Sequence, residues 1–171
     1  MLRDDLRRRY ELLHGNDKEA ARAELARLKS CGRPVVAVSA CLVGVTCRFD
    51  GRAKEDEAAL AREVGDAEIL PVCPEVLARF GVPRPAIVLD GKIAKDENGR
   101  DVTRELAEGA RLADLWASEA GAARALLKER SPSCGVTKVH GPHGLEDGQG
   151  RFAERLKKRG LPIVSEEGHG G

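Results

Sequence analysis

Residues 35–51, VVAVSACLVGVTCRFDG, decide the fold of this chain. The stretch begins as a run of apolar, β-branched residues with the length and flanks of a buried strand. It then changes abruptly to thiols, glycines, an arginine and an aspartate. Ligands of open α/β sheets bind just beyond the carboxyl ends of the strands. The stretch therefore predicts a buried strand that carries chemistry at its far end.

Two later stretches have the same form. Residues 68–75 read EILPVCPE and residues 125–135 read ALLKERSPSCG, and each apolar run ends in a polar turn that holds one cysteine. This alternation of strands and helices predicts an α/β fold of three layers, in which a mainly parallel, Rossmann-like sheet lies between helices on both faces. The helices and the last strand are predicted over residues 55–64, 104–119, 150–159 and 161–165.

The beginning of the chain predicts a helical extension. Residues 1–30 read as helix with a break at His14-Gly15-Asn16, and the second segment has a thin apolar face. We expect this extension to pack loosely and to contribute no chemistry. The predicted division is a helical N-terminal extension over 1–33 and a catalytic α/β domain over 34–171.

Three other segments predict irregular or mobile structure. Pro83 and Pro85 exclude a regular helix, and Asp90-Gly91 between two apolar runs predicts a small hairpin. The glycine-rich loop 136–150 is expected to be mobile and could act as a lid, and the tail EEGHGG is expected to fray.

Composition limits the classes of function. The net charge is only +1 and aromatic residues make up 3% of the chain, which argues against broad nucleic-acid binding. The N-terminus is charged throughout, and no apolar run is long enough to cross a bilayer, so we expect a cytoplasmic protein without a membrane partner. Thiols stay reduced in the cytosol. The five cysteines then predict metal ligands, catalytic groups or core residues rather than a disulfide framework.

Cys41, Cys73 and Cys134 follow the three predicted strands. The ends of neighbouring parallel strands lie about 5 Å apart, so three such turns can converge on one object. Three thiolates without a fourth ligand indicate a centre with an open position, such as an iron–sulfur cluster with one free iron. Structural zinc sites usually close their shell with four ligands and often use CxxC pairs, which are absent here. Three unrelated buried cysteines remain an alternative on spacing alone.

Polar neighbours of these cysteines complete the predicted site. Glu75 lies two residues after Cys73 and could act as a general base, and Ser131 lies in the turn that presents Cys134. A zinc site built from His140 and His143 with a thiol is a further alternative, although both histidines lie in the glycine-rich loop. The residues that could contact a substrate are Ser39, Arg48, Asp50 and Ser133.

The strings SACLVGVTCRFDG, PVCPE, PRP, GRDVT and KERSPSCG, in this order, closely resemble the DUF523 proteins, which include thiouracil desulfidases. The resemblance spans roughly residues 35–165. It implies a catalytic [4Fe-4S] cluster held by three cysteines only, which map to Cys41, Cys73 and Cys134. It further implies a catalytic glutamate at Glu75 and a catalytic serine at Ser131. Cys47 is not implied as a ligand.

The resemblance thus implies a desulfidase that removes sulfur from a thiolated nucleobase or nucleoside, such as 2-thiouracil or 4-thiouracil. A small-molecule substrate is favoured over tRNA by the near-neutral charge and the few aromatic residues. Two alternatives stand beside this hypothesis: a non-catalytic iron–sulfur or thiol sensor or sulfur carrier, and a zinc-binding protein.

Overall fold

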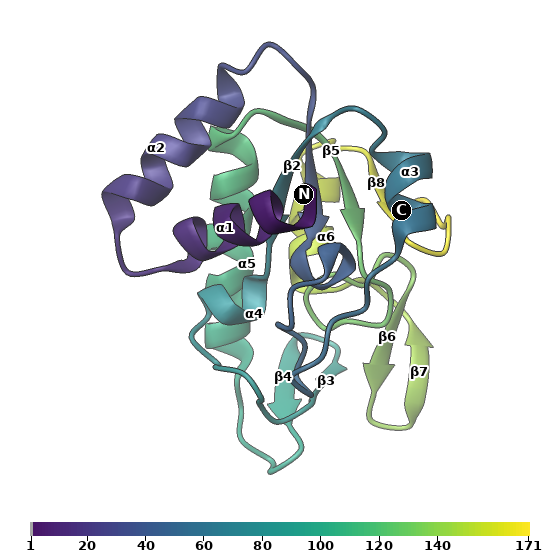
Figure 1. The fold of residues 1–171 in the computed structure, drawn as a ribbon. Coiled ribbons are helices and arrows are strands. Elements are labelled where there is room, and N and C mark those ends of the chain that lie inside the picture. Colours follow the sequence, from purple (N-terminus) through teal and green to yellow (C-terminus); the bar gives the residue numbers. More distant parts are fainter. Residues whose placement is uncertain (1) are drawn as a thin grey trace.

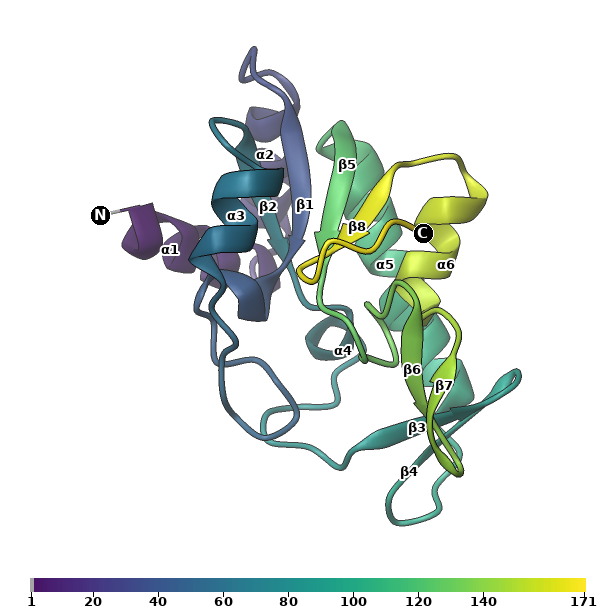
Figure 2. The same cartoon turned by 90° about the vertical axis from the view of Figure 1, so that its right-hand side faces the viewer.

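A parallel four-stranded sheet forms the centre of the protein, which a computed structural model describes over residues 2–171. The strand order is β2-β1-β5-β8, so β1 and β5 are central and β2 and β8 are the edges (Figures 1 and 2). The strands are β1 Val35–Ser39, β2 Glu68–Val72, β5 Ala122–Leu127 and β8 Ile163–Ser165.

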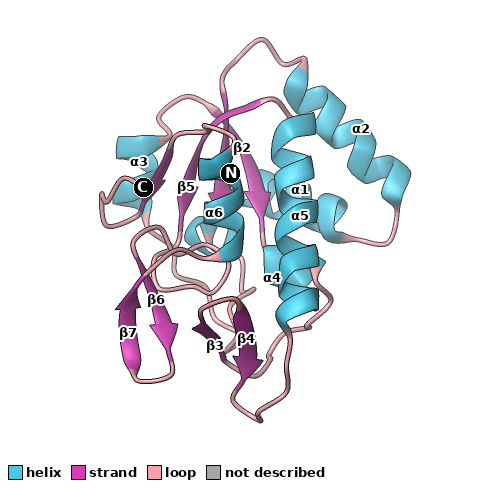
Figure 3. Ribbon diagram, turned by 180° about the vertical axis from the view of Figure 1, so that it is seen from behind, coloured by secondary structure: helices cyan, strands magenta, loops and turns pink. Residues whose placement is uncertain are grey.

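The central strand β1 is buried along its whole length, which explains its unbroken apolar sequence. Alternate residues serve opposite faces of the sheet. Val35 and Ala37 belong to one core cluster, whereas Val36 and Val38 belong to another. The predicted α/β fold with helices on both faces is therefore confirmed (Figure 3).

Helices pack on both faces of the sheet. Residues of α2, α5 and α6 fill one core cluster, and residues of α3 and of the short 3₁₀ helix η1 fill the other. None of the helices in the described residues is both long and apolar enough to cross a membrane. Their bounds are α1 Leu2–His14, α2 Lys18–Lys29, η1 Ala40–Val43, α3 Glu57–Glu63, α4 Pro74–Leu77, α5 Thr103–Glu119 and α6 Arg151–Lys158.

The N-terminal extension packs closely rather than loosely, so that expectation is wrong. Leu25 and Leu28 of α2 are buried in the same cluster as the α5 and α6 side chains. Two leucines on a thin apolar stripe are enough for close packing of α2, because the opposing surface is rich in alanine and lets the helices approach. The division at residue 33 stays a prediction.

Two antiparallel hairpins lie beyond the carboxyl ends of the central strands (Figure 2). The predicted hairpin near Asp90-Gly91 is confirmed as β3 Ile87–Asp90 and β4 Ile93–Asp96. The second, β6 Lys138–Gly141 and β7 Gly144–Asp147, occupies the segment expected to be a mobile loop.

Both the segment 136–150 and the C-terminal tail make defined contacts. In the loop, Val139 of β6 is buried in one cluster with Ile87 and Leu89, so one apolar residue anchors the hairpin to its neighbour. In the tail, the Ser165 hydroxyl accepts hydrogen bonds from the amides of Glu167 and His169. Packing on a distant hairpin in the first case, and local hydrogen bonds in the second, give structure to segments whose composition alone is typical of loops.

Candidate functional site

Three cysteines emerge from the carboxyl ends of three adjacent strands, as the sequence predicts. Cys41 lies on η1 directly after β1, Cys73 is the N-cap of α4 directly after β2, and Cys134 lies in the turn that follows β5. All three are buried and free of disulfides. The strand order β2-β1-β5 is what brings these turns together.

The three thiols line one cavity of about 670 Å³. Glu75 and Ser131 line the same cavity, together with Ser39 and Arg48. The structure therefore brings together seven of the nine residues that the sequence assigns to cluster binding, catalysis or substrate contact. Further lining residues that bear on the chemistry are Cys47, Phe49, Lys54, Arg84, Lys128, Arg130 and His140.

Burial dominates the electrostatics of the thiols. It raises the pKa of Cys41 to about 12 and raises that of Cys134 well above its ordinary value. Cys73 differs, because a hydrogen bond from the neighbouring Cys47 thiol lowers the pKa of Cys73 and raises that of Cys47. Several thiolates can share this cavity only when a positively charged centre offsets their charge.

The donor set fits a cluster better than a single ion. In the described part of the chain, no three of these thiols lie within 4.8 Å of one another, which a single metal ion would require. Yet the thiol of Cys134 interacts electrostatically with both Cys41 and Cys73 across the cavity. Soft sulfur donors spread around a cavity suit a multi-iron cluster, whose iron atoms each take one thiolate.

Glu75 forms a buried ion pair that the sequence analysis missed. Its Oε1 accepts a hydrogen bond from Arg84 Nε at 3.0 Å, and Arg84 Nη2 donates to the carbonyl oxygen of Cys47 at 2.9 Å. Both side chains of the pair are nearly inaccessible to solvent. Among the described residues, Glu75 Oε2 has no hydrogen-bond partner, so it is free to bind water in the cavity.

Two serine hydroxyls are fixed at the cavity wall. Ser131 Oγ accepts hydrogen bonds from the amides of Ser133 and Cys134, at 3.2 and 3.0 Å, which leaves its own proton free to donate. Ser39 Oγ accepts from the Lys128 amide at 2.9 Å and bonds the Cys134 thiol. Each hydroxyl therefore both shapes a cysteine-bearing turn and faces the cavity.

The structure does not bring three other candidates to the cavity. Asp50 is exposed and pairs with Arg48 at 3.2 Å. Ser133 is fully buried outside the cavity lining, and its hydroxyl has no hydrogen-bond partner among the described residues. His143 lies in the β6–β7 turn, and of the two histidines only His140 reaches the cavity wall, so the described residues form no zinc site from this pair with a thiol.

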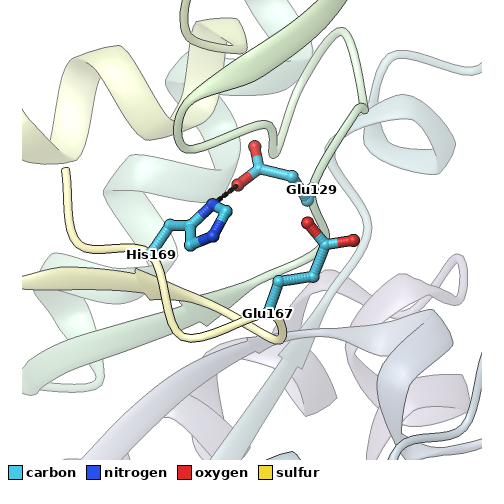
Figure 4. Close-up of side chains that lie close together, drawn as sticks. All are labelled: Glu129, Glu167 and His169. Atoms are coloured by element: carbon cyan, nitrogen blue, oxygen red, sulfur yellow. Dashed lines mark ion pairs between the residues drawn. The ribbon is translucent and has the colours of Figure 1, made fainter.

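One further group of possible metal ligands lies outside the cavity. Glu129, Glu167 and His169 place ligand atoms within 4.8 Å of one another (Figure 4). The Glu129 carboxylate is already engaged, however, because it accepts hydrogen bonds from the amides of residues 136–138 and from the Thr137 hydroxyl. We therefore interpret Glu129 as the anchor of the turn that carries Cys134.

Known proteins resemble this chain over most of its length. The family model described as 2-thiouracil desulfurase matches residues 36–168. YbbK of Bacillus subtilis (strain 168) is 32% identical over 147 residues, which are 77% of this chain and 95% of that protein. A solved structure, the [4Fe-4S]-dependent thiouracil desulfidase TudS, matches with a TM-score of 0.71 and 34% identity, over 79% of this chain and 92% of that chain. The chain therefore belongs to the 2-thiouracil desulfurase family, as its motifs predict.

Proposed function

We propose that this protein is a [4Fe-4S]-dependent desulfidase that replaces the sulfur of a thiolated nucleobase or nucleoside by oxygen. The observation that carries the proposal is the shared cavity, where three buried thiols from three strand ends face Glu75 and Ser131. Cys41, Cys73 and Cys134 would hold the cluster. The name of the TudS structure supports the cofactor and the substrate class.

The overall reaction needs no oxidant or reductant. Water supplies the oxygen that replaces sulfur at the ring carbon, and hydrosulfide and a proton leave. When bound, the cluster supplies a Lewis-acidic iron with affinity for sulfur at its position without a cysteine.

The protein supplies the proton transfer and the orientation. Glu75 Oε2 takes a proton from the attacking water, while the Arg84 guanidinium holds the carboxylate in place through Oε1. The Ser131 hydroxyl donates its free proton to the water or to the substrate. Phe49, which is 43% exposed at the cavity, offers an aromatic face on which a nucleobase ring can stack.

The test is anaerobic reconstitution followed by iron and sulfide counting, absorption spectroscopy and measurement of hydrosulfide released from 2-thiouracil and 4-thiouracil. We expect a coloured protein with four irons per chain that releases hydrosulfide. A protein that stays colourless and binds no iron would refute the proposal.

A single substitution separates an enzyme from a sensor or sulfur carrier. Glu75→Gln keeps the shape of the side chain but removes the proton acceptor, so we expect turnover to fall by roughly 10²- to 10⁴-fold while the cluster spectrum is unchanged. The matched control is Glu119→Gln, at an exposed position on α5. Equal turnover in both variants would favour the non-catalytic alternative.

A further inference from the structure

Helix α1 of the N-terminal extension packs across the edge strand β2 (Figure 1). Backbone N–H and C=O groups of alternate residues point to opposite edges of a strand. Those of residues 69, 71 and 73 point away from β1. Arg9 Nη1 donates to the carbonyl oxygen of Ile69 at 2.7 Å, and the Cys73 amide donates to His14 Nε2 at 3.1 Å. Pro71, between them, has no amide hydrogen, as suits an edge strand. Side chains of α1 therefore take the place of a neighbouring strand.

The contacts of His14 fix its tautomer. Its Nδ1 lies 3.0 Å from the carbonyl oxygen of Tyr10, which can only accept, and its Nε2 faces the amide of Cys73, which can only donate. The proton therefore sits on Nδ1. The ring stacks on Tyr10 with centroids 3.9 Å apart and meets the edge of Trp116 at 4.9 Å. His14 is thus held in one orientation with an acceptor directed at Cys73.

Cys73 begins the turn Cys73-Pro74-Glu75, which carries both a thiol of the cavity and the carboxylate. Its amide precedes α4 and faces the sheet edge, where no strand could accept it. An unpaired buried amide would leave the turn free to reorient. The imidazole of His14 removes that freedom.

We propose that His14 is a positioning residue of the active site, which accepts the Cys73 amide and so fixes both the cluster ligand and the carboxylate two residues later. This inference rests on the proposed function. The family match begins at residue 36, so His14 lies outside the matched residues, and the proposed role adds a residue of the extension to the site. The expectation that the extension contributes no chemistry is then replaced by a defined role.

Three substitutions at His14 separate the effect of its hydrogen-bond acceptor from the effect of its aromatic ring. His14→Phe keeps an aromatic ring against Tyr10 and Trp116 but has no acceptor, His14→Gln offers an amide oxygen but no ring, and His14→Ala removes both. Arg8→Ala, at a largely exposed position of the same helix, is the matched control. For each variant we would measure hydrogen exchange of the segment 70–76 in the cluster-free and loaded protein, and the rate of cluster loss to an iron chelator.

We expect His14→Phe and His14→Ala to exchange the Cys73 amide faster and to lose the cluster roughly tenfold faster than the wild type, with kcat lowered and KM unchanged. His14→Gln should restore most of each property, because it keeps an acceptor. Exchange and cluster loss in His14→Phe equal to those of the wild type would overturn the proposal, as would failure of His14→Gln to improve on His14→Ala.

A measurement on the unaltered protein guards against variants that do not fold. The ¹⁵N resonances of His14 should show a protonated Nδ1 and an unprotonated Nε2 with a hydrogen-bonded partner, and a protonated Nε2 at neutral pH would overturn the inference. Failure of the proposed function is separately visible: the wild type would then take up no iron, whereas the exchange of the Cys73 amide would still respond to His14.

Discussion

Cys73 and Cys47 lie next to each other in the cavity, and their positions in the fold differ. Cys73 caps α4 at the end of an edge strand, whereas Cys47 lies in the loop after η1 and hydrogen-bonds the Cys73 thiol. Proximity alone would make either one a ligand. The resemblance to the family implies a ligand at Cys73 and not at Cys47, and substitution can test this prediction.

We expect Cys73→Ser to lose most of its iron and Cys47→Ser to keep the full cluster. The reason is that three thiols, from the ends of β1, β2 and β5, suffice to hold the cluster while one iron stays open. Iron and sulfide counts after anaerobic reconstitution measure this, with Cys31→Ser, outside the cavity lining, as the control. Full iron in Cys73→Ser together with loss in Cys47→Ser would reverse the assignment.

Arg84 is a second residue whose role substitution can resolve. Its guanidinium binds the Glu75 carboxylate and the Cys47 carbonyl oxygen at once, which a lysine ammonium cannot do with the same planar geometry. We expect Arg84→Lys to lower kcat by roughly tenfold or more with the cluster spectrum retained, because Glu75 loses its fixed orientation. Steady-state kinetics measure the effect, and Arg79→Lys, exposed on the same loop, should match the wild type.

Sequence reasoning finds Glu75 but misses Arg84. A glutamate two residues after a strand-end cysteine is visible as a motif, whereas Arg84 follows on an irregular, proline-interrupted segment whose path the sequence does not define. The only sign of it is the string PRP, in which two prolines stiffen the backbone on either side of the arginine. An arginine held in this way is a candidate partner for a buried carboxylate, but the string PRP alone does not identify Glu75 as that partner.

Helix α5 meets α4 at a glycine, and this contact sets the position of the turn 73–75. A Cβ atom at Gly109 would stand 2.2 Å from the carbonyl oxygen of Pro74 and 2.8 Å from the Cβ of Ala78. Real side chains never approach backbone so closely. The close approach of the two helices therefore depends on the absence of a side chain at this position.

We expect Gly109→Ala to destabilise the protein by roughly 1–3 kcal/mol through overpacking and to lower turnover, since the turn with Cys73 and Glu75 must shift. Alanine has a higher helix propensity than glycine, so without the clash the substitution would stabilise the protein. A loss of stability therefore isolates the effect of the clash. The control is Ala107→Gly on the exposed face of the same helix, which should cost about 1 kcal/mol without changing turnover. Urea unfolding measures the change in stability, and steady-state kinetics measure the change in turnover. A stabilised, fully active Gly109→Ala variant would contradict the expectation.

Strands and helices with a strong apolar pattern are predictable, and contacts between distant elements are not. The buried strands β1, β2 and β5 follow from continuous apolar runs, and the convergence of their cysteines follows from parallel pairing. The hairpin β6–β7 has only Val139 and Gly141 buried, too few residues for a strand pattern, and its order comes from packing on β3. The hydrogen bond from Cys73 to His14 joins residues 59 apart, and no local pattern indicates it.

For the molecule as a whole, stability depends on a carboxylate in its interior. Glu129 is fully buried, and the loss of solvent disfavours its charged form, which by itself would raise its pKa. Hydrogen bonds from the amides of Lys138, Thr137 and Val136 and from the Thr137 hydroxyl outweigh that cost and hold the pKa of Glu129 below its ordinary value. These bonds close the loop that presents Cys134 and join the segment after β5 to the hairpin β6–β7.

A group whose pKa is lowered by folding stabilises the native state above its unfolded pKa, here 4.5, and loses that contribution as the pH falls toward its folded pKa. We expect Glu129→Gln to destabilise the metal-free protein at pH 7 by roughly 2 kcal/mol, because it removes charge-assisted hydrogen bonds in the interior. The difference from the wild type should shrink as the pH falls below 4.5, since protonation then weakens the same bonds in the wild type. Urea unfolding followed by Trp116 fluorescence at several pH values measures both effects. Glu11→Gln, exposed on α1, should show neither effect, and a difference that stays constant with pH would show that the charge of Glu129 is not what stabilises the turn.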